Sequence, residues 1–541
     1  MNQPRRITLI LVLMAAVCCI AFWWKAHQTT TRHSRPVLPD SSANQIHDTP
    51  LSAVTNLPSL SGLDGEALAR PVCSACHLFP EPNLLDKASW TSGALPEMRP
   101  WLGLAPPQIE HSRVGEVVNL TNLFPSSPLL SADEWERIVH YFETSAPESL
   151  GVWSAQSSTS LTLTLFHVEV LPYIREQAMV SMVRIDPPRK RYLIGDAMTR
   201  TLEALSGSGE LEFTVEFSSG PIDVRARPDG LDVLLPGRLF PSDLLKGSYL
   251  RLTPGTETMG MVKILDQLRR PTSLEFADLN QDQREDVVVC QFGHRLGRFS
   301  WFENLATDEY REHVLLDRPG ATIAKVRDFD GDGKPDILVL LAQAWEGVSL
   351  FRNLGDDRFE ETKLLEKHPL FGYAGLEVMD WNKDGHLDFL TVNGDNGEFA
   401  APVKPYHGLR LYLNDGRGAF QEAWFEPLPG AYQARVRDYD LDGDMDVAAI
   451  SYFPDYTTAA SSGFVYLEND GHGHFARSTF AQSTVGRWIC MDAGDIDGDG
   501  DEDVVLGSLV QGPTTIPIPS EIADPWKRRS PPVLLLRNRS R

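Results

Sequence analysis

The stretch VRDFDGDGKPDILVL, residues 326–340, decides how most of this chain folds. Its acidic residues Asp328, Asp330, Asp332 and Asp336 stand at positions 1, 3, 5 and 9 of a nine-residue loop, and the apolar run ILVL follows at once. Such a run beside turn residues is typical of a buried strand. Carboxylates this close repel one another and raise each other's pKa, and a bound cation removes that cost. The stretch therefore predicts a cation-binding turn that leads into a strand.

The same acidic ladder occurs five times between residues 271 and 510. The ladders begin at Asp278, Asp328, Asp380, Asp438 and Asp495, so the period is 50 to 58 residues. Each period also contains an apolar run that ends on asparagine, as in SLFRN and RLYLN. A period of this length suits one four-stranded blade of a β-propeller together with its loops.

Two earlier segments look like degenerate copies of the repeat. They are MVRIDPPRKRYLIGD, from near 182, and DVRARPDGLDVLLPG, from near 223, and they keep the strand pattern but lose the ladder. Five clear copies and two degenerate ones predict an all-β, seven-bladed propeller over residues 151–541. We expect the strand-like segment LTLTLFHVEV, residues 161–170, to complete the last blade and so remove an open edge.

This repeat pattern resembles the FG-GAP or VCBS repeats of integrin-α-like β-propellers, strongly over 271–510 and weakly before it. Calcium suits such a ladder, because it accepts six to eight oxygens from short aspartates and backbone carbonyls, whereas magnesium demands octahedral geometry and keeps its waters. By position, the resemblance implies as calcium ligands Asp278, Asn280, Asp282, Asp286; Asp328, Asp330, Asp332, Asp336; Asp380, Asn382, Asp384, Asp388; Asp438, Asp440, Asp442, Asp446; and Asp495, Asp497, Asp499, Asp503.

The first ladder departs from the pattern, and the overall charge follows from the ladders. Gln283 replaces the turn glycine of the first loop, and Asn280 lowers its charge, which puts its calcium affinity in doubt. The formal net charge of the chain is −24, and the five loops carry a large share of its aspartates. So acidic a chain is not expected to bind nucleic acid, whose phosphates require a basic surface.

A second motif lies in ARPVCSACHLFPEP, residues 69–82, where Cys73, Cys76 and His77 form CxxCH. Three chemistries use CxxC: zinc binding, which usually needs two such pairs, a thioredoxin-like redox pair in a βαβ setting, and attachment of haem c, which needs the following histidine. No second pair is present, since the remaining cysteines are Cys18 and Cys19 in an apolar N-terminal run and the isolated Cys290 and Cys490. Haem c is therefore favoured.

The neighbourhood of CxxCH supports this interpretation. Met98 offers a soft thioether 21 positions after His77, and His111 and His140 are its rivals as a second iron ligand. The segment SADEWERIVHYFET, 131–144, has the capping-box pattern and apolar spacing of a helix. Residues 58–148 resemble a small c-type cytochrome domain. The resemblance implies one covalent haem c, with Cys73 and Cys76 as thioethers, His77 as proximal ligand and Met98 as distal ligand.

The N-terminal residues predict a membrane anchor. Residues 7–24, ITLILVLMAAVCCIAFWW, carry no charge and are just long enough to span a bilayer. No small-residue cleavage site follows, so we interpret 1–25 as an uncleaved membrane anchor, with a cleaved signal as the alternative. Residues 26–57 are rich in Thr, Ser and Pro and predict a flexible spacer. Charge on both flanks leaves the orientation of the anchor open, but haem c attachment outside the cytoplasmic membrane would place the bulk of the chain on the periplasmic side.

Three functions remain open from the sequence. The first is an electron-transfer protein whose propeller docks a redox partner protein or a small-molecule donor. The second is a dehydrogenase in which the propeller oxidises a small molecule and the haem takes the electrons. The third is an adhesion or polysaccharide-binding propeller. Polar loop residues that would serve the second are His294, Arg295, Arg298, Asp395, Glu398, Tyr406 and His407.

The link between the two predicted domains is short. Only the eight residues ETSAPESL separate Phe142 from Gly151, and at about 3.3 Å per residue they reach roughly 26 Å. We therefore expect the cytochrome-like part to stay beside the propeller, close to the first blade or the closing blade.

Overall fold

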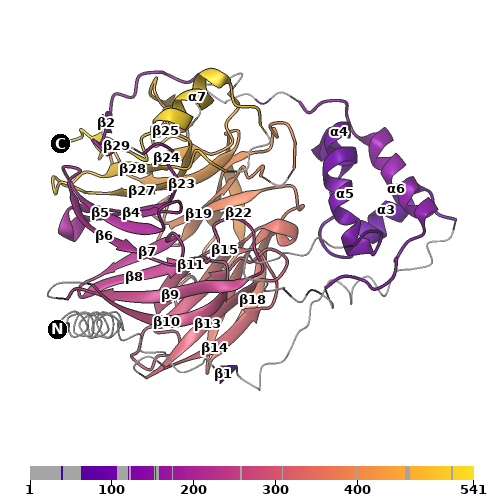
Figure 1. Cartoon of the computed structure of the whole chain (residues 1–541), viewed down its shortest axis with the longest axis horizontal. Helices are drawn as coiled ribbons and strands as arrows, with labels where there is room; N and C mark the ends of the chain where they lie inside the picture. Colours follow the sequence, from indigo (N-terminus) through magenta and orange to yellow (C-terminus); the bar gives the residue numbers. More distant parts are fainter. Residues whose placement is uncertain are drawn as a thin grey trace, which may run out of the picture.

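A computed structural model of the chain forms the basis of the structural description (Figure 1). It describes residues 38–39, 62–106, 118, 120, 123–151, 153, 158–173, 175–255, 259–306, 309–397, 399–456, 463–512 and 516–541. The anchor predicted over 1–25 lies outside the described residues, as does the spacer 26–57 apart from the two-residue strand β1 (Leu38–Pro39). Within the described ranges no helix has the length and apolar character needed to cross a membrane.

Most of the described chain forms seven sheets of a β-propeller, as predicted (Figure 1). Blade one contains β3 (Val180–Asp186), β4 (Arg191–Asp196), β5 (Thr201–Ser206) and β6 (Leu211–Glu216). Blade two contains β7 (Asp223–Arg227), β8 (Gly230–Leu235), β9 (Leu245–Thr253) and β10 (Gly260–Arg269). Blade three contains β11 (Pro271–Ala277), β12 (Asp286–Gln291), β13 (Arg298–Ala306) and β14 (Glu309–Leu316), with β1 parallel to β14.

The remaining blades repeat the same antiparallel order. Blade four contains β15 (Ala321–Arg327), β16 (Asp336–Leu341), β17 (Gly347–Gly355) and β18 (Arg358–Glu366). Blade five contains β19 (Tyr373–Met379), β20 (Asp388–Asn393), β21 (Gly408–Asn414) and β22 (Phe420–Pro427). Blade six contains β23 (Ala431–Arg437), β24 (Asp446–Ser451), β25 (Phe464–Asn469) and β26 (Phe475–Ser478).

Blade seven closes the ring by joining the two ends of the propeller. It contains β27 (Trp488–Gly494), β28 (Asp503–Ser508) and β29 (Val533–Asn538), and its outer strand is β2 (Phe166–Val170). Strand β2 pairs antiparallel with β29, from Phe166 opposite Asn538 to Val170 opposite Leu534. The predicted closure by residues 161–170 is confirmed over β2. Helix α7 (Ser520–Arg528) lies in the connection between β28 and β29.

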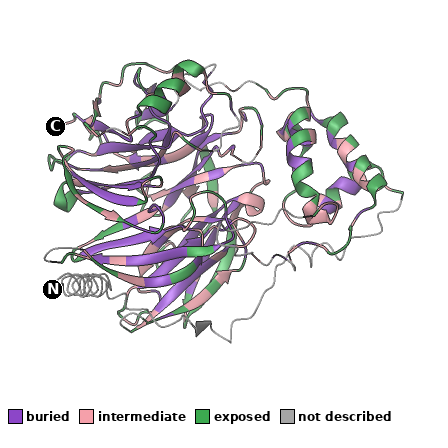
Figure 2. Ribbon diagram, viewed as in Figure 1, coloured by how far each residue is buried: buried purple, intermediate pink, exposed green. Residues whose placement is uncertain are grey.

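The core of the propeller lies between neighbouring blades. In six blades every residue of the second strand is buried, as in β16 and β24, and Figure 2 shows these strands in the buried colour. A strand covered on both faces by adjacent sheets has no polar face, so its sequence is a continuous apolar run such as ILVL and not an alternating one. The apolar runs after each acidic ladder therefore form the central layer of the wheel.

A helical unit, which we define as residues 62–148, precedes the propeller. It contains α3 (Gly65–Cys73), η1 (Pro82–Leu84), α4 (Lys87–Ser89), η2 (Trp90–Ala94), α5 (Leu95–Met98), η3 (Pro100–Leu102) and α6 (Ala132–Ser145). Ser131 and Glu134 form the predicted capping box at the start of α6. Helices α3 and α6 cross at Gly65, where a Cβ would lie 2.4 Å from the carbonyl oxygen of Arg137, so only glycine fits.

The helical unit packs on loops of blade five, and not beside blade one or blade seven as expected. Leu370 and Ala401 belong to the same buried cluster as Leu68 and Trp90 of the helical unit. The expectation was wrong because the chain needs about twenty residues, not eight, to pass from α6 to β2. Along that path the bridge between Ser160 and Ser478 holds the chain against blade six.

Candidate functional site

The acidic ladders form the loops between the first and second strands of blades three to seven. In three loops the carboxylates of positions 1, 3 and 5 offer oxygens that all lie within 4.8 Å of one another. These groups are Asp328, Asp330, Asp332; Asp438, Asp440, Asp442; and Asp495, Asp497, Asp499. In the other two loops asparagine occupies position 3, as Asn280 and Asn382. Oxygen ligands at this spacing are the kind that calcium takes.

The backbone of each ladder curls around its first aspartate. In every one of the five loops the N–H of position 6 donates to a carboxylate oxygen of position 1, as from Gly333 to Asp328 over 2.9 Å. Position 6 has a left-handed φ throughout, 85° at Gly333 and 68° at Gln283. The first loop therefore adopts the common shape, and Gln283 takes a conformation that favours glycine.

The aspartate at position 9 lies apart from these groups and is buried. Both oxygens of Asp336 accept backbone hydrogen bonds, one from Phe329 over 3.0 Å and one from Asn353 over 2.8 Å. The pattern repeats at Asp286, Asp388, Asp446 and Asp503. Burial raises the pKa of this carboxyl, to about 7 for Asp446 and Asp503, against the opposing effect of the N–H donors.

The asparagine that ends the third strand was not predicted as a functional residue. Its backbone N–H donates to the position-9 aspartate, and its side-chain amide donates to the carbonyl just before that aspartate. Asn353 also donates to the carbonyl of Leu279 in the preceding blade over 2.8 Å, which ties two blades together. The recurrence of asparagine after each apolar run is the sequence signal from which this structural role could have been predicted.

The CxxCH motif lies where helix α3 ends. Cys73 is the last residue of α3, and Cys76 and His77 follow in the turn. Cys73, Cys76, His77 and Met98 all line one cavity of about 2180 Å³. The part of its wall contributed by the helical unit is largely apolar and includes Trp90, Leu95, Trp135 and Phe142.

The titratable groups of the motif are held neutral by burial. Burial raises the pKa of the Cys73 thiol to about 12 and raises that of Cys76 as well. A redox-active CxxC needs a lowered thiol pKa, so a thioredoxin-like role is not favoured. Burial likewise lowers the pKa of His77, whose Nδ1 lies 2.9 Å from the carbonyl oxygen of Leu78.

The candidate second ligands are placed differently. Met98 ends α5, has 36% of its surface exposed and faces the cavity. His140 lies on the exposed face of α6, within 4.0 Å of Glu143. His111 lies outside the described residues. Of the candidates in the described ranges, Met98 is the one on the cavity wall.

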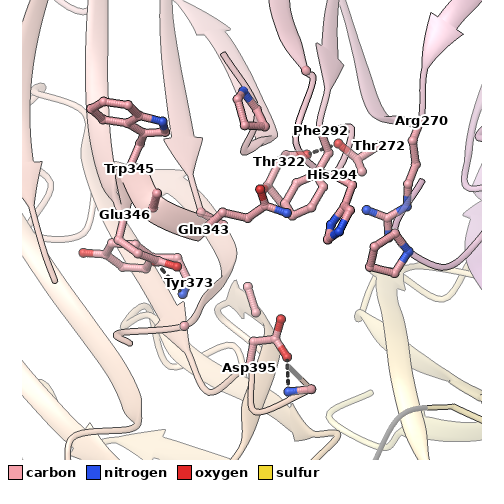
Figure 3. A pocket seen from close by; sticks show the side chains of 18 of the residues that line it. Arg270, Thr272, Phe292, His294, Thr322, Gln343, Trp345, Glu346, Tyr373 and Asp395 are labelled. Atoms are coloured by element: carbon pink, nitrogen blue, oxygen red, sulfur yellow. Dashed lines mark hydrogen bonds between the residues drawn. The ribbon is translucent and has the colours of Figure 1, made fainter. Parts of the chain in front are cut away.

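The cavity continues from the helical unit into the mouth of the propeller, and Figure 3 shows the propeller side. His294, Arg295, Arg298 and Asp395, which were singled out from the sequence, line it. Glu398 lies outside the described residues.

Two other predicted loop residues lie under the helical unit. His407 is buried, with 2% of its surface exposed. The Tyr406 hydroxyl donates to the carbonyl of Leu370 over 3.2 Å and approaches that of Leu84 at 3.4 Å. The side chain of Tyr406 therefore belongs to the contact between the two parts of the chain.

Comparison with known proteins supports the repeat assignment. A family model described as FG-GAP-like repeat matches residues 328–391, and no curated protein matches the chain. Among solved structures the chain is similar to the N-terminal domain of Nup159, with 12% identity over 71% of this chain and 97% of that one, at a TM-score of 0.40. It is also similar to the Pan2 WD40 domain of Neurospora crassa, with 9% identity over 66% and 89%, at a TM-score of 0.40. A putative 6-phosphogluconolactonase from Bacteroides fragilis shows 9% identity over 57% and 85%, at 0.39. The chain thus contains an FG-GAP-like repeat within a seven-bladed β-propeller whose strand pairings define it.

Proposed function

We propose that this chain is an extracytoplasmic haem c electron-transfer protein, tethered to the membrane by its N-terminal segment, whose calcium-stabilised propeller docks a redox partner or ligand. The observation that carries the proposal is the joint placement of Cys73, Cys76, His77 and Met98 on one cavity. Four residues chosen from sequence motifs alone meet at the same space, which is walled by aromatic side chains.

The residues present fit a covalent haem. Both thiols are free and face the cavity, so they are available for thioether bonds. Nδ1–H of His77 would donate to the carbonyl of Leu78, which fixes the tautomer of the ring. Nε2 is then the nitrogen that would bind a metal. When bound, the haem would supply one-electron transfer, and His77 with Met98 would hold its iron.

The chain's own residues would keep such a group dry and fixed in place. Trp90 donates through Nε1 to the carbonyl of Pro82 over 2.8 Å and packs on Phe142 with ring centroids 4.4 Å apart. Both side chains line the cavity. Aromatic walls exclude water, which strengthens electrostatic effects on a bound redox centre.

The extent of the cavity supports a role for the propeller in electron delivery. The same space reaches from the CxxCH motif to all seven blades, so a donor held in the propeller mouth would lie on one cavity with the haem site. A second, small cavity joins His77 to Trp345 and Lys367 of blade four.

Calcium forms part of the proposal because of the three acidic groups. Their clustered carboxylates supply hard oxygen ligands, and cation binding would relieve the repulsion between them. Lys334 forms an ion pair with Asp332, and Arg284 forms one with Asp282, so basic side chains offset part of the charge. A divalent cation would replace these pairs with stronger coordination.

One observation favours the dehydrogenase alternative, namely the polar residues that line the mouth of the propeller. Asp395 and His294 both face the cavity, and a small molecule bound between them would lie on the same space as the haem site (Figure 3). No comparable observation favours adhesion or polysaccharide binding.

Expression with a haem c attachment system tests the proposal. We expect a Soret band that stays with the protein after acid-acetone extraction, and a protein that fractionates with membranes. Met98→Ala should keep the covalent haem but lower its reduction potential, because a thioether ligand raises it. The matched control is Met198→Ala, an exposed methionine away from the cavity, which should leave the potential unchanged. A haem that extracts freely would overturn the proposal.

A further inference from the structure

Two adjacent arginines stand at the junction of blades two and three. Arg269 is the last residue of β10, Arg270 follows it, and β11 begins at Pro271. Both arginines line the cavity. Neither guanidinium forms an ion pair with any carboxylate among the described residues, and Arg269 forms no side-chain hydrogen bond there either.

Arg270 is held rigidly by neutral groups. Its guanidinium donates to the carbonyl of Leu239 from Nε over 3.1 Å and from Nη2 over 2.8 Å, and to the carbonyl of Gly293 from Nη1 over 3.3 Å. It also lies over the ring of Phe292, 5.0 Å from its centroid. Carbonyls satisfy the donors but bring no counter-charge, so the positive charge of Arg270 is left unbalanced next to the cavity.

Most of the other basic residues on the cavity wall have carboxylate partners. Three such pairs are Arg184–Asp223 at 2.7 Å, Lys325–Glu275 at 3.1 Å and Arg435–Glu377 at 3.0 Å. In all, twelve Lys or Arg and eight Asp or Glu line the cavity, although the chain carries a net charge of −24. Carboxylates behind the wall, such as Glu285 and Glu312, pair with further basic side chains of the wall, whereas Arg269 and Arg270 have no ion-pair partner among the described residues.

The acidic residue that faces Arg270 does not form a pair with it. Asp395 lies across the open space and accepts a hydrogen bond from the backbone N–H of Gly397 over 3.0 Å (Figure 3). Attraction to Asp395 and Tyr432 opposes the effect of burial on the pKa of Arg270, but burial prevails and the pKa is lowered. Burial, reinforced by repulsion from Arg298, also lowers the pKa of Arg269, although Asp317, Asp243 and Glu312 attract it from a distance.

The backbone is strained where side chains project into this space. Arg270 has φ 42° and Gln343 has φ 62°, although neither residue is glycine. Figure 3 shows Gln343 reaching into the open space between Glu346 and His294. Left-handed conformations at non-glycine residues are energetically unfavourable and cluster at ligand sites.

We propose that the propeller mouth binds an organic anion, with its carboxylate or phosphate group against Arg269 and Arg270 and its apolar body against Phe240, Phe292 and Trp345. The guanidinium fork matches the oxygens of such a group. The cavity of about 2180 Å³ exceeds the roughly 300–1,000 Å³ of ordinary ligand pockets, so it has room for a haem and a second molecule. This site goes beyond the proposed electron-transfer function and does not depend on it.

Calorimetric titration of the full-length protein with 2-naphthoate and with its uncharged isostere 2-naphthamide tests the site. We expect 2-naphthoate to bind at least tenfold more tightly than 2-naphthamide. Arg270→Gln should weaken 2-naphthoate at least tenfold and leave 2-naphthamide unchanged. Arg269→Gln should also weaken the binding of 2-naphthoate. This substitution removes no side-chain hydrogen bond among the described residues, so it still tests the site if Arg270→Gln fails to fold. The matched control is Arg200→Gln, an exposed arginine paired with Glu216 away from the cavity.

The outcomes separate clearly. Equal affinity for the charged and uncharged compounds, or affinity for 2-naphthoate that survives both arginine substitutions, overturns the anion site, as does the absence of any binding. A parallel titration with 2-naphthyl phosphate distinguishes a carboxylate site from a phosphate site. If the protein lacks a Soret band but still binds 2-naphthoate, the haem proposal is refuted and the anion site stands.

Discussion

The backbone N–H of Asn353 donates to Oδ1 of Asp336 over 2.8 Å, and both residues are buried, with 3% and 1% of their surfaces exposed. The bond joins the end of the third strand of blade four to the start of its second strand. Equivalent bonds occur in blades three, five, six and seven, each between the closing asparagine and the ninth residue of the ladder. The ladder therefore has a structural end at position 9 and a cluster of side-chain oxygens at positions 1, 3 and 5.

Asp336→Ala is expected to destabilise the propeller whether or not calcium is present. The substitution leaves the N–H groups of Phe329 and Asn353 without an acceptor. Each unsatisfied buried group costs about 1–3 kcal/mol, so the free energy of unfolding should fall by on the order of 3 kcal/mol. Chemical denaturation in excess chelator measures it. A loss that appears only in calcium would contradict the structural role of position 9.

Calcium is expected to raise the melting temperature of the propeller, because it binds the folded loops and not the unfolded chain. One site adds about 2.7 kcal/mol at a hundredfold excess over Kd. Asp330→Ala should remove part of this gain and have little effect in chelator, since Asp330 is exposed. Differential scanning calorimetry with calcium and with chelator provides the comparison. Identical melting curves in the two conditions would rule out calcium binding.

Gln283→Gly is expected to stabilise the protein by about 0.5–1 kcal/mol. Gln283 has φ 68°, where a side chain is strained, and glycine removes that strain at some cost in the entropy of the unfolded chain. Gly333→Gln is the matched reverse substitution, because Gly333 has φ 85° and open space around it. It should destabilise by a similar amount. Denaturant midpoints report both, and a shift of the same sign in both variants would argue against backbone strain.

Leu370→Ala is expected to weaken the contact between the helical unit and the propeller. Leu370 is 8% exposed and belongs to the cluster that includes Leu68 and Trp90, so its truncation should cost about 2 kcal/mol or more. Limited proteolysis should then release the helical unit faster than in the wild type. Leu354→Ala, which truncates an exposed leucine near the end of β17, is the control. Equal cleavage of both variants would show that this contact does not hold the two parts together.

The sequence by itself determined the propeller, its seven blades and the closure by β2. Each blade is encoded locally, by an acidic turn such as that at Asp328 and the apolar run after it, and these signals repeat at a near-constant period. The helix α6 was equally readable, because the capping box of Ser131 and Glu134 acts within one turn. The groups at positions 1, 3 and 5 also follow from spacing, since residues two apart in a tight loop lie close together.

Only the tertiary structure decided which residues meet across the chain. It buried Asp336 and gave its oxygens to two backbone amides, although the ladder pattern treats it like Asp330. It placed the helical unit on blade five, because apolar side chains there, such as Leu370, cover Trp90. It also left Arg270 facing a cavity with no carboxylate partner in the part of the chain that the structure describes. Pairing and burial depend on contacts between residues far apart in sequence, and no local pattern specifies them.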